Sequence, residues 1–217
     1  ITPALLECFP EKPIASLKSL VFGGDSCAQQ TMDYWSKQTY FINAYGPSEM
    51  TICATMKQVT PGVAYNNIGK AIYNTQTYIL DPHLNPTTTH VPGELYLSGI
   101  GQSPGYLNKI EKTIDSFIPN PFSNNPNDKL YKTGDRACWT PEGELLFLGR
   151  KDNQVSLRGF RIELGEIQGT IDRHPQVKQC VVSMLELTKK QITCFIIACE
   201  KLQDEDLFIN TIKQYCQ

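Results

Sequence analysis

Residues 41–51 read FINAYGPSEMT, a short β-type run that stops abruptly at a glycine and a proline. The run predicts a strand, and Gly46-Pro47 ends regular structure. Ser48 and Glu49 follow at once. A ring, a hydroxyl and a carboxylate at the end of a strand can stack on a base, bond a phosphate and hold Mg²⁺. The local alternative is a helix start, with Ser48 as the N-cap and Glu49 in the first turn.

The segments before this stretch predict a parallel pair of strands. An apolar run over 17–22 ends at Gly23-Gly24 and indicates a buried strand. Asp25-Ser26 can cap a helix over 28–37, and a second strand follows over 40–44. Strand, helix and strand in this order bring both strand ends to one edge of a sheet. Open parallel sheets bind their ligands at that edge.

The middle of the sequence has antiparallel β character. Short β-type runs cover 75–80, 94–98, 137–140 and 144–148, and turns containing Gly or Pro separate them. We expect a small, distorted barrel there. Asp135 follows Gly134 in a further strand-like run. It is either a surface residue on a turn or an acid that bonds two ribose hydroxyls.

The last part of the sequence predicts a small α+β lobe. The polar segment 149–153 leads into it and suits a hinge. A hairpin over 154–162 turns at Arg158-Gly159 and precedes a helix over 163–173. Strands are expected over 177–185 and 192–199, and a helix over 204–215 that buries Leu207, Phe208 and Ile212.

Composition excludes several function classes. The 217 residues carry a formal net charge of −2 and have no long basic run. The sequence therefore gives no electrostatic reason to expect binding to nucleic acid or to an anionic membrane. The sequence holds neither a signal-peptide core nor a membrane-spanning run. Its eight cysteines form no C-x-x-C pair and indicate a reducing, cytoplasmic location. The chain begins without Met and stops inside a helical pattern, so we expect a piece of a longer protein.

Four stretches, in order, resemble the later core motifs of the adenylation domains of nonribosomal peptide synthetases. They are NAYGPSE at 43–49, GELYLSG at 93–99 with GYL at 105–107, YKTGD at 131–135, and GRKDNQV at 149–155 with RGFRIEL at 158–164. Such domains belong to the adenylate-forming superfamily, with acyl-CoA synthetases and luciferases. The first and last motifs favour the amino-acid-activating branch, and the resemblance covers nearly the whole chain.

The resemblance implies a partial adenylate-forming fold: an α/β part, a β-barrel-like region and a small α+β lobe. It divides the chain into the end of a parallel α/β subdomain (1–64), an antiparallel β subdomain (65–151), and the hinge with a truncated C-terminal subdomain (152–217). The implied protein is a ligase of secondary metabolism. It activates an amino acid with ATP and Mg²⁺ and passes it to the phosphopantetheine thiol of a peptidyl carrier domain. Neighbouring synthetase domains are further implied partners.

The resemblance also implies nucleotide-binding roles for matching positions. Tyr45 should stack on adenine and Asn43 bond its edge, while Asp135 holds the ribose hydroxyls with the help of Arg150. The complete implied set is Asn43, Tyr45, Ile68, Gly69, Asp135, Phe147 and Arg150. In that set the pair at 68–69 lines the adenine pocket, and the aromatic at 147 packs at the ribose face.

The same resemblance assigns chemistry and motion to a second group. Ser48 should lie near phosphate and Glu49 should bind Mg²⁺, which makes these two the candidate catalytic residues. Asp152 should be the hinge about which the small lobe swings. The thiolation loop, which faces the active site during thiol transfer, should consist of Arg158, Gly159 and Phe160.

The family's side-chain pocket maps onto small or apolar positions. These are Val21, Gly23, Gly24, Ala44, Ile52 and Cys53. Because Gly23 and Ala44 leave room for a ring, we expect an aromatic or branched aliphatic substrate side chain. The alternative for Ile52 and Cys53 is ordinary packing in a helix core.

Three parts of the family pattern are missing from the sequence: the Ser/Thr/Gly-rich phosphate loop, the Asp for the substrate amine and the C-terminal Lys. Ser156 also stands where the family often has a basic residue. We therefore expect little adenylation by this chain alone, which ATP–pyrophosphate exchange tests. Two alternatives stay open. One is an acyl- or aryl-CoA ligase of the same superfamily; the other is a non-catalytic module that docks a carrier domain, which need not bind ATP.

Overall fold

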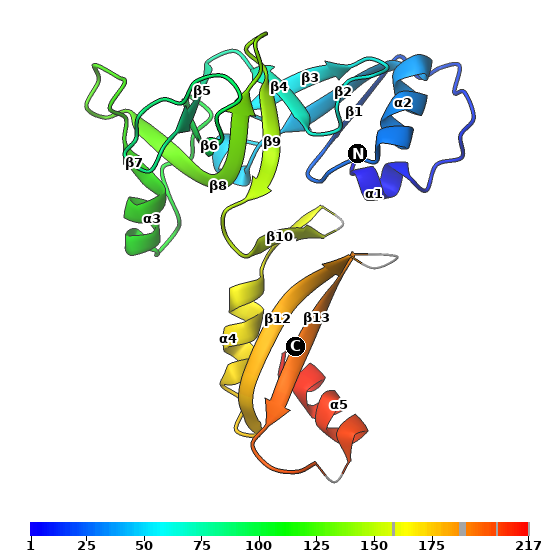
Figure 1. Ribbon diagram of the computed structural model, residues 1–217, viewed down its shortest axis with the longest axis vertical. Helices are drawn as coiled ribbons and strands as arrows, with labels where there is room; N and C mark the ends of the chain where they lie inside the picture. Colours follow the sequence, from blue (N-terminus) through cyan, green and yellow to red (C-terminus); the bar gives the residue numbers. More distant parts are fainter. Residues whose placement is uncertain (158, 187–189, 203, 217) are drawn as a thin grey trace. The chain divides into compact units, whose positions relative to one another are not determined.

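The computed structural model describes residues 1–157, 159–186, 190–202 and 204–216. Its first two strands form the predicted parallel pair (Figure 1). β1 (Ser19–Gly23) and β2 (Tyr40–Tyr45) run parallel, with Gly23 opposite Ala44, and α2 (Gln29–Gln38) connects them. The pair is only partly buried, so the expectation of a buried strand over 17–22 holds for one face: Phe22 and Phe41 face a core, whereas Val21 is exposed. In that core the rings of Phe22 and Phe41 stack with centroids 4.6 Å apart.

Two helices cover this end of the sheet. α1 (Pro3–Leu6) contributes Leu6, and α2 contributes Met32 and Trp35, all nearly inaccessible to solvent. The predicted cap of α2 is wrong, because the helix begins after Ala28. Asp25 instead accepts a hydrogen bond from the backbone N–H of Ser26 at 2.8 Å, within its own loop.

The parallel pair continues into a nine-stranded sheet. Its other strands are β3 (Thr55–Val59), β4 (Asn67–Ala71), β5 (Thr75–Leu80), β6 (Gly93–Gly99), β7 (Phe117–Pro119), β8 (Lys129–Trp139) and β9 (Leu145–Arg150). They follow the order β1-β2-β3-β4-β9-β8-β6-β5, and β7 pairs with β8. The prediction of β5 is correct in both bounds, whereas β3, β4 and β7 were not predicted.

The expected barrel is corrected to an open sheet. β4 pairs with β3 on one side and with β9 on the other, so it cannot also close onto β5. The strands of 1–64 and 65–151 are therefore hydrogen-bonded into one sheet, and the division of this part at residue 64 stays a prediction.

Two short helical segments lie beside the sheet. η1 (Ser48–Met50) is a 3₁₀ turn after β2, and α3 (Ile110–Ser116) precedes β7. Pro47 is the N-cap residue of η1 and Ser48 is its first residue, so the expected Ser48 cap is wrong. Glu49 does lie in the first turn, as predicted.

The chain divides into two compact units, Ile1–Asp152 and Asn153–Gln217. The second contains β10 (Gln154–Leu157), β11 (Phe160–Glu163), α4 (Leu164–Asp172), β12 (Val177–Glu186), β13 (Lys190–Ala198) and α5 (Glu205–Tyr215). β10 pairs antiparallel with β11, as the predicted hairpin requires, and β12 and β13, both expected as strands, also pair antiparallel. None of the described helices has the length and apolar character that a bilayer crossing needs.

The second unit has its own core between its helices and one face of β12–β13. Leu164 and Ile171 of α4 meet Phe208 and Ile212 of α5 there. The prediction that Leu207 points inward is wrong, since 66 % of it is exposed. The reason is helical geometry: Phe208 and Ile212 are four residues apart and share a face, and Leu207 lies outside it.

Candidate functional site

The carboxyl ends of β1 and β2 meet at one edge of the sheet, as the parallel pairing requires. Gly23 lies directly against β2, because a Cβ atom there would come within 2.2 Å of the Ala44 carbonyl oxygen. Gly46 is approached as closely by the chain that returns after η1, since its Cβ would lie 2.5 Å from Cys53 Cα. Small residues thus let three backbone segments converge here.

The predicted substrate-pocket residues occupy this converging region. Val21 on β1 is 42 % exposed and Ile52 is 82 % exposed. Thr51 and Ile52 both have left-handed backbones, with φ of 53° and 74°. That conformation is unfavourable for β-branched residues, and such strained residues often cluster at functional sites. The alternative that Ile52 packs in a helix core is wrong, because the residue is neither helical nor buried.

Three of the predicted nucleotide residues form one network. The Tyr45 hydroxyl donates to Asp135 Oδ2, and Arg150 Nη1 donates to Asp135 Oδ1 at 2.6 Å. Asp135 and Arg150 are partners in the β8–β9 pairing, and the Asp135 side chain is only 8 % exposed. Burial, and then the negative charge of Asp135, raises the pKa of Tyr45 well above its usual range. The phenol therefore remains a hydrogen-bond donor.

Arg150 also holds the predicted hinge residue. Its Nε and Nη2 atoms donate to the two carboxylate oxygens of Asp152 at 2.7 Å each, a bidentate pair. Gly134 makes this possible, because a Cβ atom there would lie 2.7 Å from Arg150 Nη2 and 2.8 Å from Asp152 Oδ2. One guanidinium thus joins the residue expected at the ribose to the residue expected at the hinge.

Asn43 and Gly69 lie where β2 approaches β4. Asn43 Nδ2 donates to the backbone oxygen of Asn67 at 3.0 Å, and Asn67 Oδ1 accepts the Gly69 N–H at 2.9 Å. Gly69 has φ of 76° and packs against the Met56 carbonyl. Ile68 is 5 % exposed and belongs to the hydrophobic core, so its side chain packs into the interior at this point of β4.

Phe147 completes the aromatic surface of this region. Its ring centroid lies 6.2 Å from that of Tyr45, with the planes tilted by 42°. Its backbone N–H donates to the Asn66 carbonyl at 2.8 Å, and its own carbonyl accepts from Asn66 Nδ2 at 3.1 Å. The two rings therefore meet although β2 and β9 are separated by β3 and β4 in the sheet.

Glu49 and Ser48 differ in exposure. Ser48 is exposed, whereas Glu49 is 9 % exposed and accepts a hydrogen bond from the Tyr106 hydroxyl at 2.5 Å. Mg²⁺ prefers oxygen ligands and is commonly bound by one or two carboxylates together with substrate phosphates. Within the described residues, no group of three or more His, Cys, Asp or Glu could bind a metal alone. The residues present therefore fit a Mg²⁺ ion that would be bound by one carboxylate together with the phosphates of a nucleotide.

Two of the predicted thiolation-loop residues, Gly159 and Phe160, lie in the second unit. Phe160 is 72 % exposed at the start of β11, and Gly159 is exposed with φ of 83°. Arg158 lies outside the described residues. Gly159 thus adopts the left-handed backbone that a tight hairpin turn needs.

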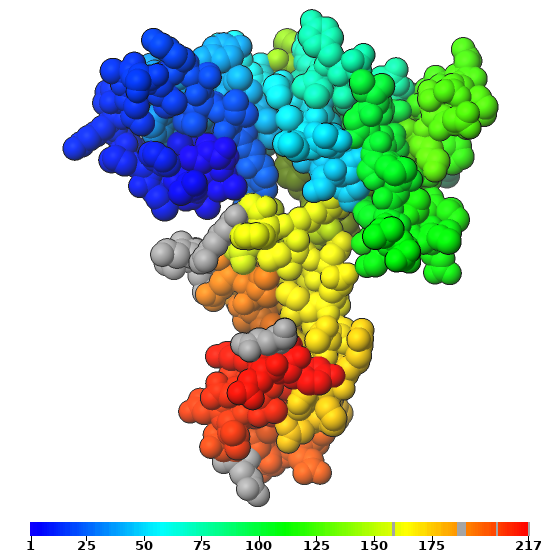
Figure 2. Space-filling view, turned by 180° about the vertical axis from the view of Figure 1, so that it is seen from behind, coloured from blue at the N-terminus to red at the C-terminus, as the bar shows by residue number. Residues whose placement is uncertain are grey.

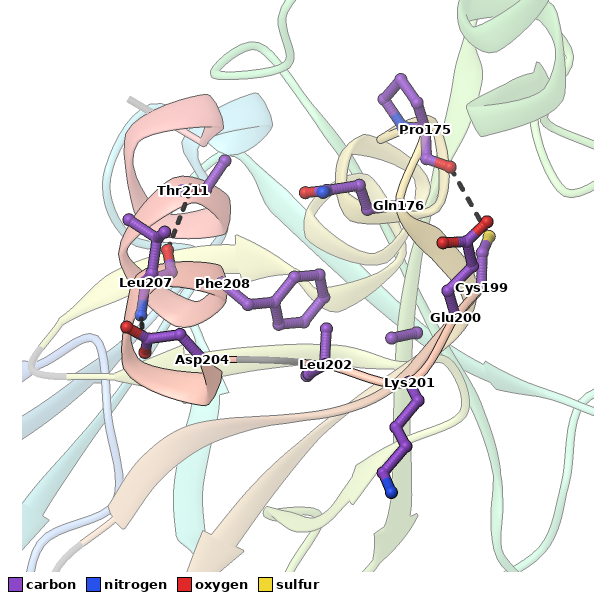
Figure 3. Close-up of a pocket in the computed structure, with 11 residues that line it drawn as sticks. Pro175, Gln176, Cys199, Glu200, Lys201, Leu202, Asp204, Leu207, Phe208 and Thr211 are labelled. Atoms are coloured by element: carbon purple, nitrogen blue, oxygen red, sulfur yellow. Dashed lines mark hydrogen bonds between the residues drawn. The ribbon is translucent and has the colours of Figure 1, made fainter.

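The second unit also contains a pocket of about 540 Å³ (Figure 3). It lies between the start of β12, the end of β13 and α5, and the Phe208 ring points into it. Asp204 caps α5 at its rim, accepting from the Leu207 N–H at 2.9 Å. None of the predicted site residues lines it.

Three residues that position the site were not predicted. Thr133 accepts the Asp135 N–H at 2.9 Å and donates to the Leu95 carbonyl at 2.7 Å, which fixes the backbone of Asp135. Asn67 links β2 to β4, and Tyr106 reaches Glu49. Thr133 and Tyr106 stand inside the motifs that carry the resemblance, so their place in those motifs was the available signal.

Comparisons with known proteins agree on one family. Residues 2–107 match the model of the AMP-binding enzymes. A linear gramicidin synthase from Brevibacillus parabrevis is 40 % identical over 202 residues, which are 92 % of this chain and 4 % of the synthase. Bacitracin synthase 3 of Bacillus licheniformis is 41 % identical over 182 residues, which are 84 % of this chain and 3 % of that protein.

A solved structure agrees with the sequence comparisons. An NRPS protein containing adenylation and PCP domains superimposes with a TM-score of 0.79 at 29 % identity. The match covers 90 % of this chain and 42 % of that protein. The chain therefore spans a small part of the synthases and less than half of the solved protein.

Proposed function

This chain belongs to the AMP-binding enzymes, as part of an adenylate-forming ligase similar to the adenylation domains of nonribosomal peptide synthetases, and we propose that it forms the nucleotide-binding wall of an amino-acid-activating site. The observation that supports this most is the network of Tyr45, Asp135 and Arg150. In this network a buried carboxylate on β8 is oriented by a phenol at the carboxyl end of β2 and by a guanidinium on β9.

In this proposal the ribose binds at Asp135. A carboxylate has about four acceptor positions, so it can accept from two ribose hydroxyls while Tyr45 and Arg150 hold it. Because the carboxylate is already oriented, nucleotide binding costs less reorganisation. The rings of Tyr45 and Phe147 provide the aromatic surface for the base, and Asn43 lies on the same strand as Tyr45.

The proposed reaction needs positioning more than acid–base catalysis. An amino acid carboxylate is itself the nucleophile that attacks the α-phosphate, and pyrophosphate leaves. The requirement is to hold the two reactants together and to stabilise charge on the phosphate. Glu49, with Ser48 next to it, is the residue that would hold Mg²⁺, which supplies part of that charge stabilisation when bound.

The finer parts of the proposal concern the substrate and the carrier. Two observations support a substrate with an apolar or aromatic side chain. Val21 and Ile52 are exposed apolar residues, and the small residues Gly23 and Ala44 are paired on β1 and β2. The acyl group would pass to the phosphopantetheine of a carrier domain, with Phe160 in the loop that faces the thiol. We also propose that the 217-residue chain by itself shows little ATP–pyrophosphate exchange, because its sequence lacks the phosphate loop and the Lys of the family.

Calorimetry with ATP and 2′,3′-dideoxy-ATP tests the ribose assignment. Asp135→Asn should weaken ATP binding about tenfold or more, because a charged hydrogen-bond acceptor is lost. It should change dideoxy-ATP binding much less. Asp128→Asn is the matched control, since Asp128 lies in an exposed loop and bonds Ser123 and Asn125. Equal ATP affinity in Asp135→Asn and the unmodified chain would refute the assignment.

A further inference from the structure

Glu49 is held by a side chain from a distant part of the sequence. Its Oε1 atom accepts a hydrogen bond of 2.5 Å from the hydroxyl of Tyr106, 57 residues further along. Tyr106 lies in the loop between β6 and α3 and is itself half-buried. The carboxylate of η1 is thus tied to a second segment of the chain.

The Tyr106 side chain has little freedom to move. Its backbone N–H donates to Thr113 Oγ1 at 2.9 Å, and its ring lies edge-on to Phe117 with centroids 5.7 Å apart. Lys112 on α3 places its Nζ atom 5.2 Å from the ring centroid. α3 itself lies at the surface of the first unit, where it is green in Figure 2. The phenol is therefore anchored by the helix and by β7.

The backbone repeats the connection between the two segments. The Ser103 N–H donates to the Glu49 carbonyl at 2.8 Å, and Thr51 Oγ1 donates to the Gly101 carbonyl at 2.7 Å. Gly105 has φ of 146°, and a Cβ atom there would lie 2.4 Å from Thr113 Cγ2. The loop over 101–106 thus follows η1 closely and ends with Tyr106 at the carboxylate.

We propose that Tyr106 is a positioning residue that holds the Glu49 carboxylate in the orientation in which it binds the metal of the metal–nucleotide complex. The inference rests on the proposed function, since it requires Glu49 to be the metal ligand. Carboxylates that bind metals are commonly held by such outer hydrogen bonds, and removing the partner typically costs about 10- to 100-fold in metal affinity.

The test compares ATP affinity in MgCl₂ with ATP affinity in EDTA, measured by calorimetry on the full 217-residue chain. The ratio of the two affinities reports the metal's contribution and does not depend on turnover. Tyr106→Phe should lower this ratio about tenfold and leave the affinity in EDTA unchanged. Tyr34→Phe is the matched control, because among the described residues the buried Tyr34 hydroxyl has no hydrogen-bond partner. It should leave both affinities unchanged.

Glu49→Gln separates this inference from the proposed function. It should lower the ratio at least as much as Tyr106→Phe, and the double variant should lose no more than Glu49→Gln alone. If Glu49→Gln lowers the ratio and Tyr106→Phe does not, the positioning role is wrong and the proposed function stands. If Glu49→Gln leaves the ratio unchanged, the metal assignment fails and the positioning role fails with it.

A second variant covers a possible folding defect in Tyr106→Phe. Thr113→Val keeps the phenol but removes the hydroxyl that anchors the Tyr106 backbone, on a helix that faces solvent. It should lower the ratio in the same direction by a smaller factor, with an unchanged thermal transition. An unchanged ratio in this folded variant would count against the anchored geometry and overturn the proposal.

Discussion

Asp135 is the residue on which the proposed site depends most. It is buried, and a buried carboxylate is stable only when donors surround it. Tyr45 donates to the carboxylate from β2 and Arg150 from β9, and the Thr133 hydroxyl on β8 accepts the backbone N–H of Asp135. Removing one of these donors leaves the charge in place and less well compensated. The network therefore serves stability and nucleotide binding together.

The Tyr45–Asp135 contact predicts a pH dependence of stability. The pKa of Tyr45 is raised in the folded state, whereas an unfolded tyrosine titrates near about 10. The contribution of the neutral phenol is thus fully present below about pH 10 and is lost as pH rises towards the folded pKa, at up to about 1.4 kcal/mol per pH unit.

Urea unfolding of Tyr45→Phe and of the unmodified chain, from about pH 8 to about pH 11, measures this contribution. At the lower pH the variant should be less stable by about 1–2 kcal/mol, because Asp135 loses a donor. The difference should shrink as pH rises above about 10. A difference that stays constant over the whole range would show that the phenol does not titrate as the contact requires.

β4 shows how one glycine positions an element. Gly69 combines φ of 76° with a backbone that touches Met56 of β3. A side chain at this position would strain the backbone and also push β4 away from β3. Asn67, on β4 like Gly69, accepts hydrogen bonds from the Gly69 N–H and from Asn43 of β2. A displacement of β4 would therefore also move Asn43, which is proposed to bind adenine.

Gly69→Ala should destabilise the first unit by about 3 kcal/mol, through backbone strain and overpacking together. Gly143→Ala is the matched control: Gly143 has φ of 70° but nothing within 4 Å of its Cβ position, so only the strain of about 1–2 kcal/mol applies. Urea unfolding at neutral pH compares them. Equal losses would mean that the contact with Met56 relaxes without cost.

The two units have separate hydrophobic cores, so a core mutation in one should not weaken the other. Phe208 is 8 % exposed and belongs to the second core, whereas its neighbour Leu207 is 66 % exposed. Phe208→Ala should cost about 3 kcal/mol in the second unit, and Leu207→Ala less than about 1 kcal/mol.

Hydrogen exchange read by mass spectrometry locates the effect. Phe208→Ala should speed amide exchange in α4, β12 and β13 and leave exchange in β6, β8 and β9 unchanged. Leu207→Ala should change neither set. Faster exchange in the strands of the first unit after Phe208→Ala would show that the units unfold together.

Local pattern was enough for elements that carry their own signal. β5 forms over the predicted residues, and α4 forms within one residue of its predicted bounds, because the residue types of both segments favour these structures locally. β3 and β4 read TMKQV and NIGKA, which have little apolar alternation. They are strands because the neighbouring strands β2 and β9 offer them unpaired backbone groups, and no local pattern expresses that.

The family of this chain was evident from its sequence, because four motifs in order and at the right spacing need no knowledge of the fold. The carboxyl edge at β1 and β2 followed too, since a strand–helix–strand segment forces parallel pairing. Which residues meet there was decided only by the tertiary structure. Tyr45 and Asp135 are 90 residues apart and Glu49 and Tyr106 are 57 apart. Such contacts depend on how nine strands are ordered in one sheet, and that order results from long-range backbone pairing that short motifs do not encode.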